Sequence, residues 1–457
     1  MGTLYLICDA VPARRNITDV NLTLKGRLGL AVAVRPGVMP LDASAFTRPF
    51  WRDKKMSALF EPITLGGLSL PNRIAVSPMC QFSAIEGTVQ PFHLAHVGGL
   101  MMSGAGVVIM EATATEAIGR ISHDCLGLYS DDHEAALTDL VAQVRSYSNG
   151  AIGIQLSHAG RRASCRSVRA RVLDPTGSEW LTEDEGAWQT CGPSSHGYNP
   201  EWHQPEAMDA AAIRRVEGAF VHSAQRADRA GFDLIEIHGA HGYLIHQFLS
   251  PVTNHRTDGY GGSLENRMRF ALELVAQVRA VWPRNKALGF RMNSTDWHPD
   301  GLTLEDAAVL AVELERAGVD YIVMSAGNLA PGCQIPPATP GHQVSYAERM
   351  KKAVSIPVMA VGLIATPSLA EEIVSQQSAD MVAIGRGMLD NPRWGLHAAA
   401  ALGVDVPYAH QYIRVRPNNW TGYAIAHPGG KKIVSTQQLD RPKSSSWDRP
   451  DIARGAS

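Results

Sequence analysis

Short apolar runs rich in β-branched residues recur through the middle of the chain, and each is followed by a longer segment typical of a helix. We expect strands over 73–77, 107–111, 151–155, 234–237, 288–292, 321–324, 357–361 and 381–384. We expect helices over 92–103, 132–146, 209–230, 266–281, 303–317, 346–354 and 368–375, and after Pro392. Eight such pairs predict an α/β fold of the (β/α)8 TIM-barrel type, with a doubly wound sheet as the alternative. No Gly-x-Gly-x-x-Gly opens any of these helices, which weakens a dinucleotide-binding interpretation.

The two ends of the chain lack this alternation. Residues 1–55 contain no Glu, and Asp9 interrupts their early apolar run, so a secretory signal is disfavoured and a transit peptide stays open. We prefer an extension or a misplaced start, with the fold beginning near Met56. The polar, Pro- and Gly-containing segment 418–457 is expected to be disordered, which leaves a single barrel domain over 56–417.

The composition excludes several classes of function. A net charge of -2 gives no footprint for nucleic acid or for an anionic membrane surface. The six cysteines contain no Cys-x-x-Cys, which argues against a disulfide scaffold, a zinc ribbon and an iron–sulfur cluster. No apolar run reaches the roughly 18 residues of a membrane span. We therefore expect a cytoplasmic protein that acts on small molecules.

The most informative motif is His238-Gly-Ala-His241-Gly-Tyr243, which directly follows the apolar run 232–237. Two imidazoles three residues apart on a turn can hold one oxygen atom, and a nearby phenol can supply a proton. Two other interpretations are open, namely buried histidines that satisfy backbone groups and a metal site. No Asp, Glu or Cys of ligand spacing accompanies the pair, so we expect no metal.

Other polar or unusual residues fall at the ends of the expected strands, where a β/α barrel places its catalytic groups. Gly362 and Gly385 would let backbone N–H groups approach a phosphate after strands seven and eight, and Arg386 adds a donor fork. A buried Arg291 needs an anionic partner, either a structural acid or an anionic ring system. Gln155 and Ala112 suit a flat ligand.

Several long motifs in order resemble the Old Yellow Enzyme family of FMN-dependent ene-reductases, in its thermophilic-like, xenobiotic-reductase branch. The likeness runs from about residue 59 to about residue 417. The motifs are Pro71-Asn-Arg-Ile, Ser77-Pro-Met-Cys80, Gln155-Leu-Ser-His-Ala-Gly-Arg161, Glu236-Ile-His-Gly-Ala-His-Gly-Tyr243, Phe248-Leu-Ser-Pro251, Asn254-His-Arg-Thr-Asp-Gly-Tyr-Gly-Gly-Ser-Leu-Glu-Asn-Arg267 and Gly385-Arg386.

This resemblance implies an oxidoreductase that uses NAD(P)H, with NADPH preferred, and non-covalent FMN to reduce the C=C bond of α,β-unsaturated carbonyl compounds. It makes His238 and His241 the ligands of the substrate carbonyl and Tyr243 the proton donor. Phe82 is a departure, because similar enzymes usually have Tyr there, and it leaves substrate preference in doubt. Arg414 is implied to reach a neighbouring subunit's site in a homodimer or homotetramer. The residues implied to hold FMN are Ser77, Pro78, Met79, Cys80, Ala112, Gln155, Arg291, Gly362, Gly385 and Arg386.

Two alternatives of other classes stay open. A phosphate-binding aldolase or isomerase on the same barrel would need a Lys or Glu at a strand end, and Glu111 is the candidate. A non-catalytic flavin-binding protein is disfavoured by the intact His238, His241 and Tyr243 set.

Overall fold

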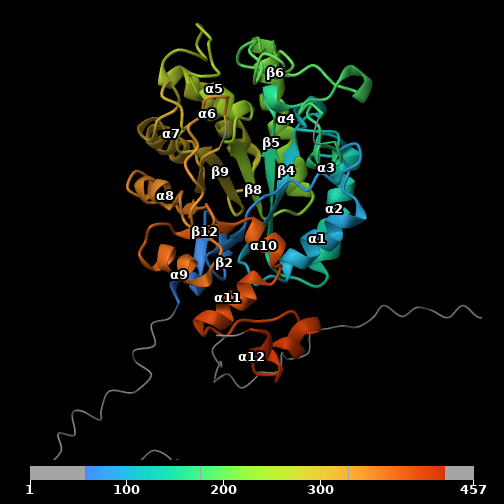
Figure 1. Cartoon of the computed structure of the whole chain (residues 1–457), viewed down its shortest axis with the longest axis vertical. Helices are drawn as coiled ribbons and strands as arrows, with labels where there is room; N and C mark the ends of the chain where they lie inside the picture. The colour runs from blue at the N-terminus through green and yellow to red at the C-terminus, as the bar shows by residue number, and fades with distance from the viewer. Residues whose placement is uncertain (1–56, 175–176, 328, 428–457) are drawn as a thin grey trace, which may run out of the picture. The chain divides into compact units, whose positions relative to one another are not determined.

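Eight parallel strands close into a barrel, as the alternation predicts (Figure 1). The computed structural model describes residues 57–174, 177–327 and 329–427. Neighbours around the barrel follow the order β10-β11-β12-β3-β4-β5-β8-β9, which is the chain order of a (β/α)8 fold. The strands are β3 (Ile74–Val76), β4 (Val107–Ala114), β5 (Ala151–Ser157), β8 (Leu234–Gly239), β9 (Ala287–Asn293), β10 (Tyr321–Ser325), β11 (Val358–Ala360) and β12 (Met381–Ile384).

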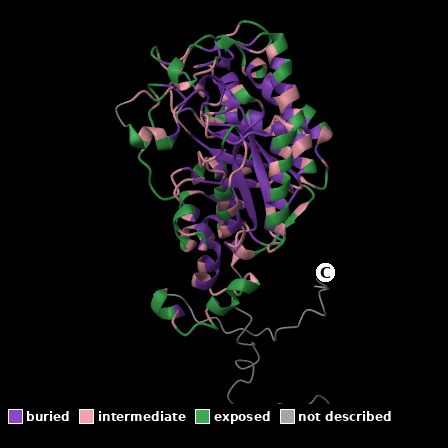
Figure 2. Cartoon of the chain, turned by 90° about the vertical axis from the view of Figure 1, so that its right-hand side faces the viewer, coloured by how far each residue is buried: buried purple, intermediate pink, exposed green. Residues whose placement is uncertain are grey.

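Helices surround the strands. Each helix buries the face that packs on the barrel and exposes the opposite face (Figure 2). Their starts follow from local chemistry: the side chains of Ser130, Asp209, Ser263, Thr303 and Thr366 each accept a hydrogen bond from a free backbone N–H of the first turn. The main helices are α1 (Pro91–Met101), α2 (Asp131–Arg145), α4 (Ala210–Arg229), α6 (Leu264–Val281), α7 (Leu304–Arg316), α8 (Val344–Lys351), α9 (Pro367–Ser375) and α11 (Trp394–Leu402).

The core has two layers, one between strands and helices and one inside the barrel. The inner layer uses alternate strand positions, because successive side chains of a strand point to opposite faces. Tyr321 fills much of this space, and Gly289 makes it possible: a Cβ on Gly289 would lie 2.0 Å from the Tyr321 ring. The Tyr321 hydroxyl donates to buried Glu236 at 3.2 Å. The barrel interior therefore contains a carboxylate that only tertiary packing reveals.

Several short elements were not expected from the sequence. The hairpin β1 (Ile63–Leu65) and β2 (Leu68–Leu70) contributes Leu65 and Leu70 to the inner core layer. The long β5–α4 connection contains η4 (Gly160–Arg162), α3 (Val168–Leu173), η5 (Glu183–Glu185), β6 (Cys191–Gly192) and β7 (Glu206–Ala207). The other short elements are η2 (Ala58–Phe60), η3 (Ala117–Gly119), α5 (Leu244–Leu249), α10 (Arg386–Asp390), η6 (His410–Val415) and α12 (Tyr423–Ala426).

The helix α12 lies within the segment 418–457 for which we expected disorder, and residues 428–457 lie outside the described part of the chain, as does the expected extension 1–55. Among the described residues, no helix is both long and apolar enough to cross a membrane.

Candidate functional site

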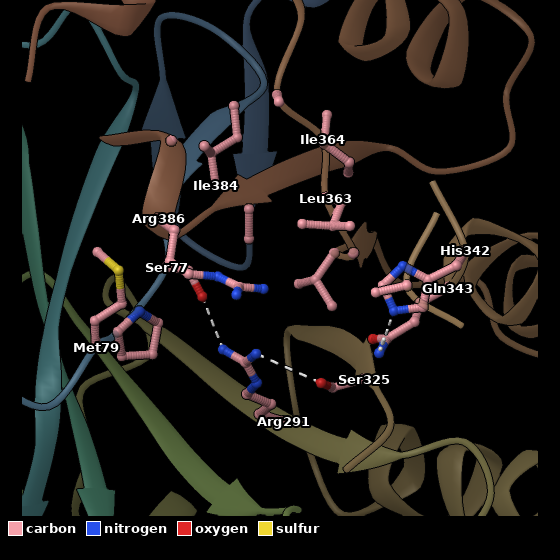
Figure 3. A pocket seen from close by; sticks show the side chains of 18 residues that line it. Ser77, Met79, Arg291, Ser325, His342, Gln343, Leu363, Ile364, Ile384 and Arg386 are labelled. Carbon is pink, nitrogen blue, oxygen red and sulfur yellow. Dashed lines mark hydrogen bonds between the residues drawn. The ribbon is translucent and has the colours of Figure 1, made fainter. Parts of the chain in front are cut away.

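A cavity of about 330 Å³ opens at the carboxyl ends of the barrel strands (Figure 3). Ser77, Pro78 and Met79 line it after β3, and Gly385 and Arg386 line it after β12. Arg291 on β9 and Gly362 after β11 complete the part of this wall that the sequence predicts. Cys80, Ala112 and Gln155 do not line this cavity.

Arg291 is the buried charge of the cavity wall. Its Nη1 donates to Ser77 Oγ at 2.8 Å and its Nη2 to Ser325 Oγ at 3.5 Å (Figure 3). Its Nε has no hydrogen-bond partner among the described residues. The charge interacts with Glu236, whose pKa is raised by burial, with Arg291 opposing that rise. The structure thus gives Arg291 an acidic partner and still leaves a donor for a ligand.

One row of side chains crosses three strands behind this arginine. The backbone register pairs Ala112 with Gln155 and Gln155 with Glu236, and β4 shifts register between Met110 and Ala112. Gln155 Nε2 donates to Glu236 Oε1 at 2.7 Å, which fixes its amide and turns the amide oxygen away from the carboxylate. The small side chain of Ala112 beside this amide is consistent with the predicted site for a flat ligand.

Two glycines let the backbone come close to the cavity. Gly362 has φ +110, which side-chain-bearing residues rarely adopt, and a Cβ there would lie 3.1 Å from Gln343. A Cβ on Gly385 would lie 3.3 Å from Met79 Sδ. The exposed Arg386 directly follows Gly385 in the chain. Accessible backbone and a guanidinium therefore lie on one wall of the cavity, and both kinds of group bind phosphate.

The structure brings His238, His241 and Tyr243 together where β8 ends. His241 Nδ1 lies 3.3 Å from His238 Nε2, and the Tyr243 ring stands at 86° to His238 with centroids 5.0 Å apart. The register of β8 and β9 pairs His238 with Arg291, so this cluster adjoins the cavity wall. Three groups separated along a loop therefore lie beside the buried cation.

Burial sets the protonation of this cluster. It lowers the pKa of both His238 and His241 well below the usual value, and the Arg291 charge lowers each further. It raises the pKa of Tyr243, an effect that the nearby Cys80 thiol reinforces and Arg162 opposes. At neutral pH both imidazoles are uncharged hydrogen-bond donors and the phenol keeps its proton.

A buried histidine–carboxylate hydrogen bond supports the turn that carries these groups. His246 accepts the Gly242 N–H at Nδ1 (2.9 Å) and directs Nε2 to Asp296 Oδ1 (2.7 Å). Asp296 also accepts from Ser250 Oγ at 2.5 Å and from the Leu302 backbone N–H at 2.7 Å. His241 has φ +59, a strained conformation that its backbone N–H bond to Asn293 (3.0 Å) helps to hold.

Comparison with known proteins decides the family. Residues 58–403 match the model of the NADH:flavin oxidoreductase / NADH oxidase family. The chain belongs to this family. An NADPH dehydrogenase of Geobacillus thermodenitrificans is 40% identical over 360 residues, which are 78% of this chain and 98% of that protein.

Solved structures that resemble this chain support its assignment to the flavin oxidoreductase family. Morphinone reductase in complex with tetrahydroNAD is 28% identical with a TM-score of 0.61, over 76% of this chain and 92% of that one. An Old Yellow Enzyme homologue from Zymomonas mobilis has a TM-score of 0.60 at 23% identity, over 73% and 90% of the two chains, and shows the same fold. The predicted barrel and the predicted Old Yellow Enzyme-type family are thus confirmed.

FMN is the cofactor of this flavin oxidoreductase family, and the cavity fits it. The unpartnered Nε of Arg291 provides a donor for an anionic ring system, and the Gly362, Gly385 and Arg386 wall suits a phosphate. Ser325, His342 and Gln343 on the same cavity and Glu236 behind it were not expected from the sequence. Ser325 directly follows the expected strand 321–324, so its position was available as a signal, whereas Gln343 lies in a loop without one.

The remaining predicted substrate residues, Phe82 and Arg414, and the predicted flavin-binding Cys80 are not among the residues that line the cavity. Phe82 is half-buried with φ +50, and Cys80 is half-buried with its pKa raised well above the usual value by burial. Arg414 is exposed on η6 and does not line the cavity.

Two acidic clusters outside the cavity have structural explanations. Glu111, the candidate base of an aldolase, accepts the Gln81 N–H at 2.9 Å and faces His93 at 3.5 Å. Among the described residues, Glu116, His158 and Cys191 lie close enough to hold a metal. However, His158 already bonds the Gly160 N–H at Nδ1 and lies 2.8 Å from Glu116 at Nε2, so both of its ring nitrogens have partners within the protein.

Proposed function

We propose that this flavin oxidoreductase reduces the C=C bond of α,β-unsaturated carbonyl compounds with NAD(P)H, NADPH being preferred. The observation that carries the proposal is the cluster of two neutral imidazoles and a protonated phenol beside Arg291, next to the cavity that fits FMN. The reaction consumes one hydride from NAD(P)H and one proton, and converts the alkene into a saturated carbonyl compound.

When bound, FMN would carry hydride from the nicotinamide to the β-carbon of the alkene. Ser77, Pro78, Met79, Arg291, Gly362, Gly385 and Arg386 are proposed to hold it from the cavity wall, with Cys80, Ala112 and Gln155 beside its ring. A permanent cation at Arg291 stabilises negative charge on a bound ring system because the surroundings are buried.

His238 and His241 are proposed to bind the carbonyl oxygen of the substrate. Negative charge grows on this oxygen as hydride reaches the β-carbon, so donors aimed at it stabilise the transition state more than the ground state. Tyr243 is proposed to give its proton to the α-carbon, and Arg162, whose guanidinium lies 5.7 Å from the ring centroid, favours the phenolate that results. Phe82 is proposed to contact substrate as an apolar wall.

The test is to measure the two half-reactions of FMN-loaded protein separately without oxygen. We expect NADPH to bleach the visible flavin absorption and cyclohexenone to restore it with formation of cyclohexanone. Tyr243→Phe should keep the bleaching and slow the recovery by about 10²- to 10⁴-fold, the usual contribution of a general acid. Tyr147→Phe removes the same hydroxyl from a groove between α1 and α2 and should change neither rate. Unimpaired recovery in Tyr243→Phe would show that another group donates the proton.

A further inference from the structure

A chain of hydrogen bonds connects the cofactor cavity to the imidazole pair through Ser325 at the end of β10. Arg291 Nη2 donates to Ser325 Oγ at 3.5 Å, and His241 Nε2 lies 2.8 Å from the same oxygen. His241 Nδ1 lies 3.3 Å from His238 Nε2, and the Ala240 backbone N–H donates to His238 Nδ1 at 3.3 Å. The order of donors along this chain fixes where each imidazole carries its proton.

The Ala240 backbone N–H determines the tautomer of His238. This N–H can be accepted only by an unprotonated Nδ1, so neutral His238 carries its proton on Nε2 and points it at His241. His241 then accepts at Nδ1 and donates from Nε2 to Ser325. In this arrangement both ring protons are used within the protein, and His241 has no donor to offer a carbonyl oxygen placed between the two rings.

The Ser325 hydroxyl allows a second arrangement. Its oxygen accepts from Arg291 and from His241, and apart from His241 Nε2 the described part of the chain holds no acceptor for its proton. If Ser325 donates to Nε2 instead, the His241 proton sits on Nδ1. That Nδ1–H then faces His238 Nε2–H across 3.3 Å, which is unfavourable unless an oxygen between them accepts from both.

We propose that Ser325 is a positioning residue that lets His241 change tautomer when a carbonyl oxygen binds. The proposal rests on the proposed function and adds the step that turns an internally bonded histidine pair into a two-donor clamp. The ring keeps the same number of protons: one leaves Nε2, one arrives at Nδ1 by exchange with water, and Ser325 retains its own. Binding also gives the Ser325 proton an acceptor, so the serine contributes to substrate affinity as well as to geometry.

The direct test is the ¹⁵N spectrum of the imidazoles in FMN-loaded protein labelled at histidine, with His241→Asn used to assign the signals. The probe is cyclohexanone, which has the carbonyl but no C=C bond to reduce. We expect His241 to be protonated at Nε2 without the ketone and at Nδ1 with it. Ser325→Thr, which keeps the hydroxyl, should show the same change, and Ser325→Ala should not.

Affinity and kinetics provide a second readout. Ser325→Ala should bind cyclohexanone up to about 10-fold more weakly, the loss expected for one hydrogen bond, and slow flavin reoxidation by cyclohexenone to a similar extent. Flavin reduction by NADPH should change less, and Ser325→Thr should restore affinity. An unchanged His241 tautomer on ketone binding, or the same change in Ser325→Ala, would overturn the proposal. If Ser325→Ala fails to retain FMN, the wild-type and Ser325→Thr spectra still decide. Wild-type protein that does not reduce cyclohexenone would overturn the proposed function instead.

Discussion

Replacing Asp296 by Asn should destabilise the protein and disturb the catalytic turn, although the two side chains have the same shape. Asp296 is fully buried and accepts hydrogen bonds from His246, Ser250 and the Leu302 backbone. An amide turns one of its two acceptor atoms into a donor that faces a donor. If the His246 ring changes tautomer to compensate, its Nδ1–H faces the Gly242 N–H.

The cost can be worked from these contacts. Hydrogen bonds to a charged group contribute about 1.5–3 kcal/mol each, and leaving a buried donor or acceptor without its partner costs about 1–3 kcal/mol. We therefore expect Asp296→Asn to lower the free energy of unfolding by about 3 kcal/mol at neutral pH. Asp258→Asn is the matched control, because the same change breaks a half-exposed pair with Arg256 and should cost about 1 kcal/mol or less.

The pH dependence gives a sharper criterion. Burial raises the pKa of Asp296, but His246, the Ser250 hydroxyl and the Leu302 backbone N–H together outweigh this, and the net pKa lies below the usual value. A depressed carboxyl pKa stabilises the fold above the unfolded pKa of about 3.9, and this contribution is lost as the pH falls through the folded pKa. Denaturant unfolding of FMN-loaded protein should show a constant difference between wild type and Asp296→Asn above about pH 5, and a smaller one below about pH 4. A loss no larger than that of Asp258→Asn, or one independent of pH, would refute this reasoning.

Three further predictions follow from single sites. Arg291→Met should weaken FMN binding by at least about 10-fold, because it removes a buried cation from the cavity wall; equilibrium dialysis against FMN measures this, and unchanged binding would contradict the role of the charge. Gly289→Ala should destabilise the fold by about 1–3 kcal/mol or more, since its Cβ would overlap the Tyr321 ring, and the thermal midpoint should return when Tyr321 is shortened to Leu in the same chain. Arg414 is predicted to act in a neighbouring subunit's site of a homodimer or homotetramer, and exposed apolar residues flank it. Arg414→Ala should therefore raise KM for cyclohexenone without changing the mass measured by light scattering, and a monomeric wild type would exclude that role.

The sequence predicted the fold because each strand–helix pair carries its own signal. An apolar β-branched run such as 321–324 and a capped helix such as the one that begins after Thr303 are recognisable without knowledge of their neighbours. The hairpin at 63–70 escaped prediction because its strands have three residues each, too few for a periodic pattern. The expectation that the ordered chain ends near residue 417 depended on composition alone, which does not detect a one-turn helix such as Tyr423–Ala426.

The sequence by itself determined which chemical groups this protein has and at which strand ends they lie, since a motif such as His238 to Tyr243 fixes side chains to one turn. Tertiary structure decided how those groups are paired. Glu236 faces Arg291, Ser325 joins Arg291 to His241, and Asp296 supports the turn through His246. All of these contacts connect residues that lie 34 or more positions apart, and the Glu236–Arg291 and Ser325–Arg291 pairs connect different strands. Side chains that are distant in sequence meet only when the barrel closes, and their burial then decides which of them keep their protons.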